Sequence, residues 1–198
     1  MILKGAGANG SGKTTLAREF MKLWEFTPFT DAKGKVLEYH AWPTSKQLLY
    51  RKFKTIVVLG DYRNVCGGMD AVSDKDRRLD LVKEYCDRKD TLVLYEGILV
   101  GVTWGAMGEL SLRSKVPWVY WFMNTPYEEC VRRVEARRKA KGNLTPFDGM
   151  RSLHPKIRSC ESVARKAETA GHKVHWVDWK ETPEYQVKHL LDVVKGMK

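Results

Sequence analysis

The sequence predicts an α/β protein, a three-layer sandwich in which helices cover both faces of a mostly parallel sheet. Three observations lead to this prediction. Short apolar runs alternate with longer stretches of helical periodicity, which is the pattern of consecutive βαβ units. A glycine-rich loop separates the first apolar run from the first helical stretch. Two later apolar runs are followed by an acid, at the sheet edge where such folds bind ligands.

The 198 residues are expected to form a single domain, because no Pro/Ser-rich linker divides the chain. Six apolar runs are the predicted strands, at residues 2–5, 36–40, 55–60, 91–96, 118–123 and 173–177. Ser73 and Thr182 are the predicted caps of two helices. The predicted helices carry apolar stripes that begin at Leu16, Leu79, Tyr127, Ile157 and Val187.

Composition excludes several classes of protein. No run approaches the ~18 apolar residues of a membrane span, and the first residues lead directly into the glycine-rich loop, which leaves no room for a signal peptide. The cysteines lack the paired spacing of a zinc site or a disulfide framework, and their pattern favours a reducing compartment. We therefore expect a cytoplasmic protein without membrane contact. The cysteines are Cys66, Cys86, Cys130 and Cys160.

The charge of the chain is strongly positive, at +11. Residues 132–166 hold eleven basic residues against three acidic ones, a net charge of +8. A field of that sign attracts polyanions and speeds their capture. We therefore predict a basic, lid-like segment at about 132–166 that faces nucleic acid or polyphosphate. A solvated basic face with no special partner is the alternative.

Residues 7–14 match the pattern G-x-x-x-x-G-K-[ST] between a predicted strand and a predicted helix. In this pattern backbone N–H groups surround a phosphate, the lysine reaches the β- and γ-phosphates, and the hydroxyl binds Mg²⁺. The weaker G-x-G-x-x-G pattern of dinucleotide-binding proteins is also present, but it leaves Lys13 and Thr14 without a role. The predicted ATP contacts are Gly7, Ala8, Asn9, Gly10, Ser11, Gly12, Lys13, Thr14, Thr15 and Arg133.

Acidic residues follow two of the predicted strands. Glu96 is expected to hold Mg²⁺ together with Thr14, with a helix cap or an arginine pair as the alternative. Asp61 is expected to take the proton of an alcohol acceptor, and Arg63 to bind a phosphate of the acceptor or keep Asp61 ionised. A turn-forming role for Asp61 stays open. Asp70 would either contact the substrate or cap the turn.

The helix predicted after Pro126 is rich in arginine. Arg138 falls in line with the apolar stripe of this helix, and Arg137 lies at the border of the stripe. Because arginines stabilise a transferring phosphoryl group, one of these two is expected to do so, and the pattern does not choose between them. Residues 139–143 are the predicted turn of a lid.

The glycine-rich loop at 7–14, the Asp-Tyr-Arg triplet at 61–63 and the arginine-rich helix together resemble the phosphate-loop kinases of nucleosides, nucleotides and polynucleotide ends. The segments 60–70 and 94–98 are similar to small single-domain phage kinases, among them the 5-hydroxymethyluracil DNA kinases. The resemblance implies the nucleotide-kinase-like fold of the P-loop NTPases. It also implies that Asp61 acts on the hydroxyl of the acceptor.

Resemblance and charge together imply an Mg²⁺- and ATP-dependent kinase that phosphorylates a hydroxyl in DNA. The favoured acceptor is the hydroxymethyl group of 5-hydroxymethyluracil, which would have to leave the base stack of a duplex to reach the site. No obligate protein partner is implied. The alternatives are a thymidylate-like nucleotide kinase, a polynucleotide 5′-hydroxyl kinase, a DNA-binding NTPase and a nicotinamide-dependent reductase.

Overall fold

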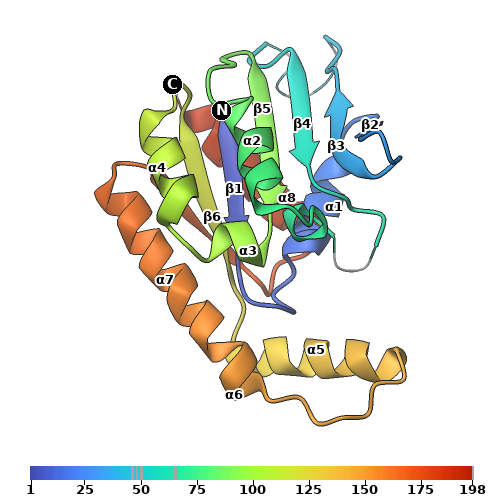
Figure 1. Ribbon diagram of the computed structural model, residues 1–198. Helices are drawn as coiled ribbons and strands as arrows, with labels where there is room; N and C mark the ends of the chain where they lie inside the picture. Colours follow the sequence, from blue (N-terminus) through green and yellow to red (C-terminus); the bar gives the residue numbers. More distant parts are fainter. Residues whose placement is uncertain (46, 48, 50, 65–66, 198) are drawn as a thin grey trace.

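One seven-stranded sheet runs through the computed structural model, which describes residues 1–45, 47, 49, 51–64 and 67–197 (Figure 1). The strand order is β2-β3-β4-β5-β1-β6-β7, and the strands from β4 to β7 in that order are parallel. β3 and β2 extend the sheet in antiparallel fashion. The strands are β1 (Ile2–Ala6), β2 (Thr27–Thr30), β3 (Val36–Ala41), β4 (Thr55–Leu59), β5 (Thr91–Glu96), β6 (Trp118–Asn124) and β7 (Lys173–Asp178).

All six predicted strands are present, and the mostly parallel sheet is confirmed. The sequence analysis missed β2. Its four residues are all exposed and include Pro28, so this edge strand has neither apolar alternation nor a buried face to reveal it.

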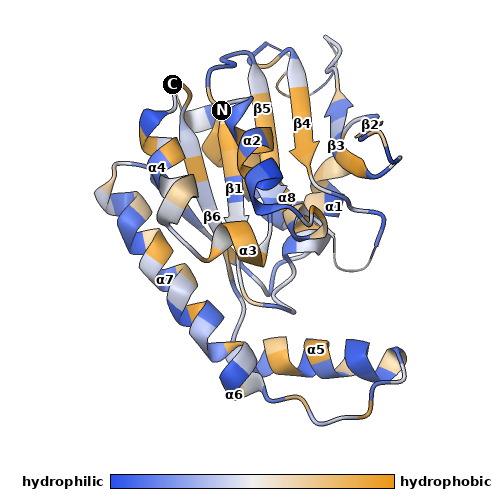
Figure 2. Cartoon of the chain, in the orientation of Figure 1, coloured by the Kyte–Doolittle hydropathy of each residue, from blue (hydrophilic) through white to orange (hydrophobic). Residues whose placement is uncertain are grey.

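The helices form the two outer layers of the sandwich. α1 and α8 cover one face of the sheet, where they bury Phe20 and Leu190 against Leu3. α2, α4 and α7 cover the other face and share a core with Ile2. Figure 2 shows the apolar strands enclosed between helices of mixed polarity. The helices are α1 (Lys13–Met21), α2 (Lys75–Lys83), α3 (Ile98–Gly101), α4 (Gly105–Arg113), α5 (Tyr127–Ala140), α6 (Gly149–Ser152), α7 (His154–Thr169) and α8 (Pro183–Gly196), with a 3₁₀ turn, η1, at Met69–Ala71.

One predicted helix cap is wrong by a single residue. Asp74, not Ser73, caps α2, and its carboxylate accepts hydrogen bonds from the backbone N–H groups of Asp76 and Arg77. Both residue types are good caps, so the spacing alone does not choose between them. The cap position predicted for α8 at Thr182 is confirmed. The short helices α3, α4 and α6 were not predicted.

The predicted basic segment divides into two parts. α5 and the connection after it project away from the sheet (Figure 1). α7, by contrast, packs against β6 and β7, with Cys160, Ala164 and Ala167 buried. The second half of the segment therefore belongs to a helical layer, and only α5 with residues 141–148 has the position of a lid.

The cysteines that the structure describes contribute to packing. Cys86, Cys130 and Cys160 are buried, and burial raises the pKa of each thiol. Cys66 lies outside the described residues. Among the helices described, none combines the length and apolarity needed to cross a membrane.

Candidate active site

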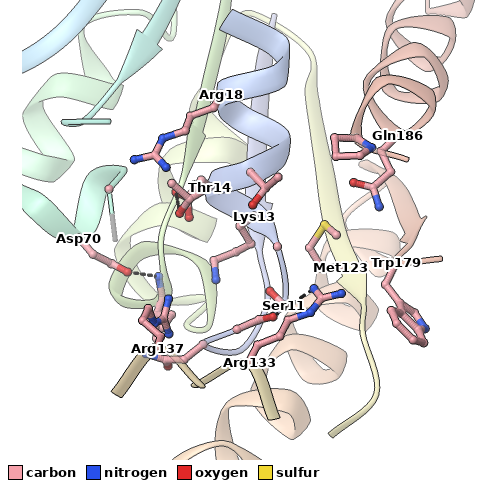
Figure 3. A pocket seen from close by; sticks show the side chains of 18 of the residues that line it. Ser11, Lys13, Thr14, Arg18, Asp70, Met123, Arg133, Arg137, Trp179 and Gln186 are labelled. Atoms are coloured by element: carbon pink, nitrogen blue, oxygen red, sulfur yellow. Dashed lines mark hydrogen bonds between the residues drawn. The ribbon is translucent and has the colours of Figure 1, made fainter. Parts of the chain in front are cut away.

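A cavity of about 460 Å³ lies at the carboxyl ends of the central strands (Figure 3). Its wall includes Asn9 to Thr15 of the glycine-rich loop, Glu96 of β5, and Arg133 and Arg137 of α5. Figure 3 shows Lys13 in the middle of the lining, with Asp70 and Trp179 on opposite sides. The cavity thus joins the glycine-rich loop to two different regions, one on each side of Lys13.

The glycine-rich loop presents positive and hydrogen-bonding groups to the cavity. Lys13 Nζ donates to the carbonyl oxygens of Gly7 (3.0 Å) and Ala8 (3.1 Å), which lie behind the lining. Ser11 Oγ is buried and has no hydrogen-bond partner among the described residues. A phosphate oxygen would satisfy such a hydroxyl, and the amino end of α1 adds positive potential. The predicted phosphate site therefore has the chemistry that a phosphate needs.

The glycine-rich loop is also packed tightly from behind. Gly10 has a φ of +81°, and a Cβ at this position would lie 2.6 Å from the carbonyl oxygen of Cys130 in α5. Thr125 Oγ1 donates to the Ser11 carbonyl oxygen (2.8 Å), and Lys156 Nζ donates to Asn9 Oδ1 (2.9 Å). The loop conformation is therefore fixed by α5, α7 and the β6–α5 turn together.

Thr14 and Glu96 form the predicted pair. Thr14 Oγ1 donates to Glu96 Oε1 over 2.9 Å. Glu96 is 1% exposed, and this burial raises the pKa of its carboxyl group to about 7. A hydroxyl and a buried carboxylate are hard oxygen donors of the kind that Mg²⁺ prefers, and a bound cation would offset the cost of burying the charge. The residues present therefore fit the metal.

Asp61 lies beside the cavity but is not among the described residues that line it. Its carboxylate accepts three hydrogen bonds from the Arg63 guanidinium: from Nε to Oδ1 (3.0 Å) and Oδ2 (3.3 Å), and from Nη2 to Oδ2 (2.8 Å). Arg63 holds the pKa of Asp61 below its usual range. Asp61 Oδ1 also accepts the backbone N–H of Arg63 (3.0 Å), which is an Asx turn. Of the two roles predicted for Arg63, the structure shows the ion pair with Asp61. The turn left open for Asp61 is present as well.

The loop that follows β4 comes very close to Glu96. We call its described residues, 61–64 and 67–70, the β4 loop. Gly68 has a φ of +83°, and a Cβ there would lie 2.4 Å from Glu96 Oε1, so no other residue fits. Arg18 of α1 holds the same loop by donating to the carbonyl oxygens of Tyr62 and Asn64. The β4 loop is therefore tied to both the metal pair and the phosphate-binding helix.

Asp70 lines the cavity, yet both of its carboxylate oxygens are engaged. Oδ2 accepts the N–H of Ile98 (2.7 Å), and Oδ1 accepts the N–H of Leu99 (2.9 Å). The carboxylate therefore caps α3 and joins the β4 loop to the end of β5. Of the two predicted roles, the structure shows a cap, although its partner is a helix 28 residues away.

Arg137 and Arg138, between which the sequence did not choose, point to different parts of the structure. Arg137 lines the cavity. Arg138 does not. Its Nη2 donates to Asn143 Oδ1 (3.1 Å) and to the Thr145 carbonyl oxygen (3.2 Å), and its guanidinium lies over the ring of Phe147. Arg138 continues the apolar stripe as predicted, but its guanidinium contacts the returning chain, and of the two arginines only Arg137 is among the described residues that line the cavity.

Known proteins similar to this chain identify its family. The chain is 31% identical over 196 residues to a "5-hmdU DNA kinase" of Pseudomonas phage PaMx11, covering 96% of this chain and 97% of that one. A second relative with the same name, from Pseudomonas phage M6, is 26% identical and covers 94% of this chain. The chain belongs to the 5-hmdU DNA kinase family. It is therefore a phosphotransferase. No protein-family profile matches the kinase.

Solved structures support the fold of the kinase. A gluconokinase from Sinorhizobium meliloti 1021 has a TM-score of 0.50 at 10% identity and covers 98% of this chain and 90% of its own. A deoxyadenosine kinase from M. mycoides has a TM-score of 0.50 at 11% identity, with full coverage of both chains. At these identities the likeness concerns the fold alone, and it confirms the predicted P-loop kinase architecture.

The sequence analysis missed one wall of the kinase cavity. Trp179 and Glu181 line it from the connection between β7 and α8, and Pro183 and Gln186 line it from the beginning of α8. The guanidinium of Arg133 lies 5.7 Å from the ring centre of Trp179, and its Nη1 donates to the Gly10 carbonyl oxygen (3.3 Å). These residues follow the carboxyl end of a predicted strand, and that position was the available signal.

Proposed function

We propose that this kinase transfers the γ-phosphoryl group of ATP to the hydroxymethyl group of 5-hydroxymethyluracil in DNA. The observation that carries the proposal is the single cavity that joins a phosphate-binding loop to the β4 loop, in a chain whose relatives are named 5-hmdU DNA kinases. The cavity has room for a triphosphate on Lys13 and for an acceptor on one side of it.

ATP would bind with its triphosphate on the glycine-rich loop and its base toward Trp179. The N–H groups of residues 9–15 and Lys13 Nζ would hold the β- and γ-phosphates. The Trp179 ring and the Arg133 guanidinium offer an aromatic face and a planar cation against which a base can stack. The acceptor is then left with the opposite side, next to Asp70 and the β4 loop.

Mg²⁺ would be held by Thr14 and Glu96 together with phosphate oxygens. When bound, it supplies positive charge that offsets the negative charge of the phosphates during transfer. Lys13 and Arg137 add to this charge from the protein side, since both line the cavity. The electrostatic requirement of phosphoryl transfer is thereby met by residues from β5, α1 and α5.

The transfer itself requires one bond to form and one to break. The oxygen of the hydroxymethyl group attacks the γ-phosphorus, the bond from that phosphorus to the β–γ bridging oxygen breaks, and ADP leaves. The proton of the hydroxyl passes to the carboxylate of Asp61, which Arg63 keeps ionised. In this scheme the acceptor hydroxyl donates to the Asp61 carboxylate while Arg63 stays beside it.

DNA is the proposed partner because the exposed residues at the far end of α5 are basic. Lys139 and Lys141 are exposed there, close in sequence to Arg137 of the cavity wall. We place the reaction in the cytoplasm of a phage-infected host, since both named relatives are phage proteins. No protein partner is invoked.

The test is a panel of acceptors incubated with γ-labelled ATP and Mg²⁺. We expect label in DNA that contains 5-hydroxymethyluracil, and none in matched DNA with thymine, in a 5′-hydroxyl oligonucleotide or in thymidylate. A DNA acceptor should also lose affinity steeply as salt rises. Label in thymidylate or only at 5′ ends would replace this proposal with one of the alternative acceptors.

A further inference from the structure

Leu144 is the most exposed large apolar side chain that the structure describes. Its exposed fraction is 81%, in the connection between α5 and α6. Phe147, three residues later, is partly buried and packs against the small core of Ala8, Cys130 and Leu153. The connection therefore has one apolar residue, Phe147, that packs against the protein and another, Leu144, that is exposed to solvent.

The turn around Leu144 is held in place from both sides. Arg138 Nη2 donates to Asn143 Oδ1 and to the Thr145 carbonyl oxygen, which are the two neighbours of Leu144. The N–H of Thr145 also donates to Asn143 Oδ1 (3.2 Å), and the N–H of Asn143 donates to the Arg138 carbonyl oxygen (3.0 Å). Leu144 is thus presented by an organised turn, in contrast to a residue that projects from a loose loop.

The surroundings of Leu144 are basic. Arg132, Arg138 and Lys139 line the same surface hollow as Leu144, against one acid among the described residues, Glu135. Lys141 and Arg151, close to Leu144 in sequence, are exposed. Asp148 is the acid nearest in sequence, and its carboxylate accepts the N–H of Arg151 as the cap of α6. An exposed apolar side chain surrounded by cations is complementary to a partner that has an anionic surface and an apolar interior. Duplex nucleic acid has that combination, with phosphates outside and stacked bases within.

We propose that Leu144 enters the base stack of duplex DNA at the place that the modified base leaves, and that Arg138 positions Leu144 for this. The inference rests on the proposed function, because it requires that the acceptor be a base inside DNA. A base that moves into an enzyme cavity leaves a gap in the stack, and proteins that deform DNA commonly fill such a step with a leucine or similar residue. Arg137 lines the cavity and Arg138 holds the turn, so the same helix, α5, carries a residue of the cavity wall and the turn that presents Leu144.

The test compares one DNA strand in two states, alone and paired with its complement. Leu144→Ala should lower the rate of phosphorylation in the duplex about tenfold, because the cost of leaving the stack is no longer offset. The rate on the single strand should change less than twofold, since no duplex has to open. Arg138→Ala should show the same duplex-specific loss. Leu112→Ala, which changes a leucine of α4 with 53% exposure, is the matched control and should leave both rates unaltered.

A second measurement separates failure of this inference from failure of the proposed function. With 2-aminopurine beside the modified base in a duplex, the kinase should raise the fluorescence, and Leu144→Ala should reduce that rise. Equal losses on the duplex and the single strand, or no loss on either, would overturn the role of Leu144. If the unaltered kinase labels neither the duplex nor the single strand, the proposed acceptor is wrong. If Leu144→Ala gives the same rise in fluorescence as the unaltered kinase, the role of Leu144 is wrong.

Discussion

The two ends of α5 show how differently the two sides of this active site are built. At its beginning, α5 packs against the glycine-rich loop, with Cys130 and Val134 buried and no space for a side chain at Gly10. At its end, the helix is exposed and basic, and the turn beyond it is held by the hydrogen bonds of Arg138. The phosphate-binding side is thus fixed by close packing. The outer end of α5, where we propose that DNA binds, is fixed by a few polar contacts, which suits a surface that has to receive a large partner.

The largest expected effect comes from the phosphate-binding side. Lys13→Ala should lower phosphoryl transfer about a thousandfold, because it removes a cation from the developing charge. The thermal unfolding curve should stay unchanged, since only hydrogen bonds to Gly7 and Ala8 are lost. Lys22→Ala, at the exposed end of the same helix, is the control and should retain activity. Transfer that survives in Lys13→Ala would remove the assignment of the phosphate loop.

The next effect concerns the β4 loop. Asp61→Asn should reduce turnover about a hundredfold, as expected for loss of a proton acceptor. Its affinity for ATP should change less than twofold, because Asp61 is not part of the described cavity wall. Turnover and ATP binding are measured on the same preparation. A variant that instead unfolds would assign Asp61 to the Asx turn and the Arg63 pair.

A smaller effect is expected from the exposed end of α5. Reversing the charge of Lys139, Lys141 and Arg151 should weaken DNA binding about tenfold at moderate salt and flatten its salt dependence, with ATP affinity unaltered. If DNA affinity does not change, this face is merely solvated. The control reverses three exposed lysines before the amino ends of β4, β5 and β6: Lys54, Lys89 and Lys115. Lys54 and Lys115 are paired with Asp90 and Asp87, so the folding of this control is checked first.

The smallest effect is on stability alone and tests the close packing behind the phosphate loop. Lys4 of β1 is fully buried, and its Nζ has no hydrogen-bond partner among the described residues. Lys4→Met should raise the free energy of unfolding by about 1–4 kcal/mol near pH 7, because an apolar side chain suits this site better. ATP-dependent transfer should be preserved. A loss of stability would show that the ammonium group has a role in the core.

The pH dependence of this stabilisation has a definite sign. Burial lowers the pKa of Lys4 from 10.5 to about 7. Between these two values the unfolded chain binds a proton that the folded chain does not, so the unaltered kinase gains stability as pH rises. Lys4→Met lacks this gain, and its advantage should be greatest near pH 7 and shrink toward pH 10. Chemical denaturation at several pH values measures the difference.

The sequence revealed those parts of the site that depend on local spacing. The loop through Lys13 and Thr14 and the strand-end position of Glu96 follow from short patterns, and the structure brings them together. Contacts between segments that are distant in the chain could not be predicted from the sequence. The cap that Asp70 provides for α3 and the approach of Trp179 to Arg133 depend on tertiary packing. Arg138 followed the predicted helical phase, but the chain that folds back over it could not be foreseen from that phase.

The contact between Gly68 and Glu96 restricts how the substrate range of this kinase can be altered. Because Gly68 packs directly against Glu96, enlarging the β4 loop at this point to admit a bulkier acceptor would displace the carboxylate that we assign to the metal. Substitutions in that loop that admit a bulkier acceptor should therefore also weaken the binding of Mg²⁺. Among the described residues, the outer end of α5 is not in contact with that carboxylate. Variation in acceptor preference, in the laboratory or among relatives, is therefore expected to concentrate there.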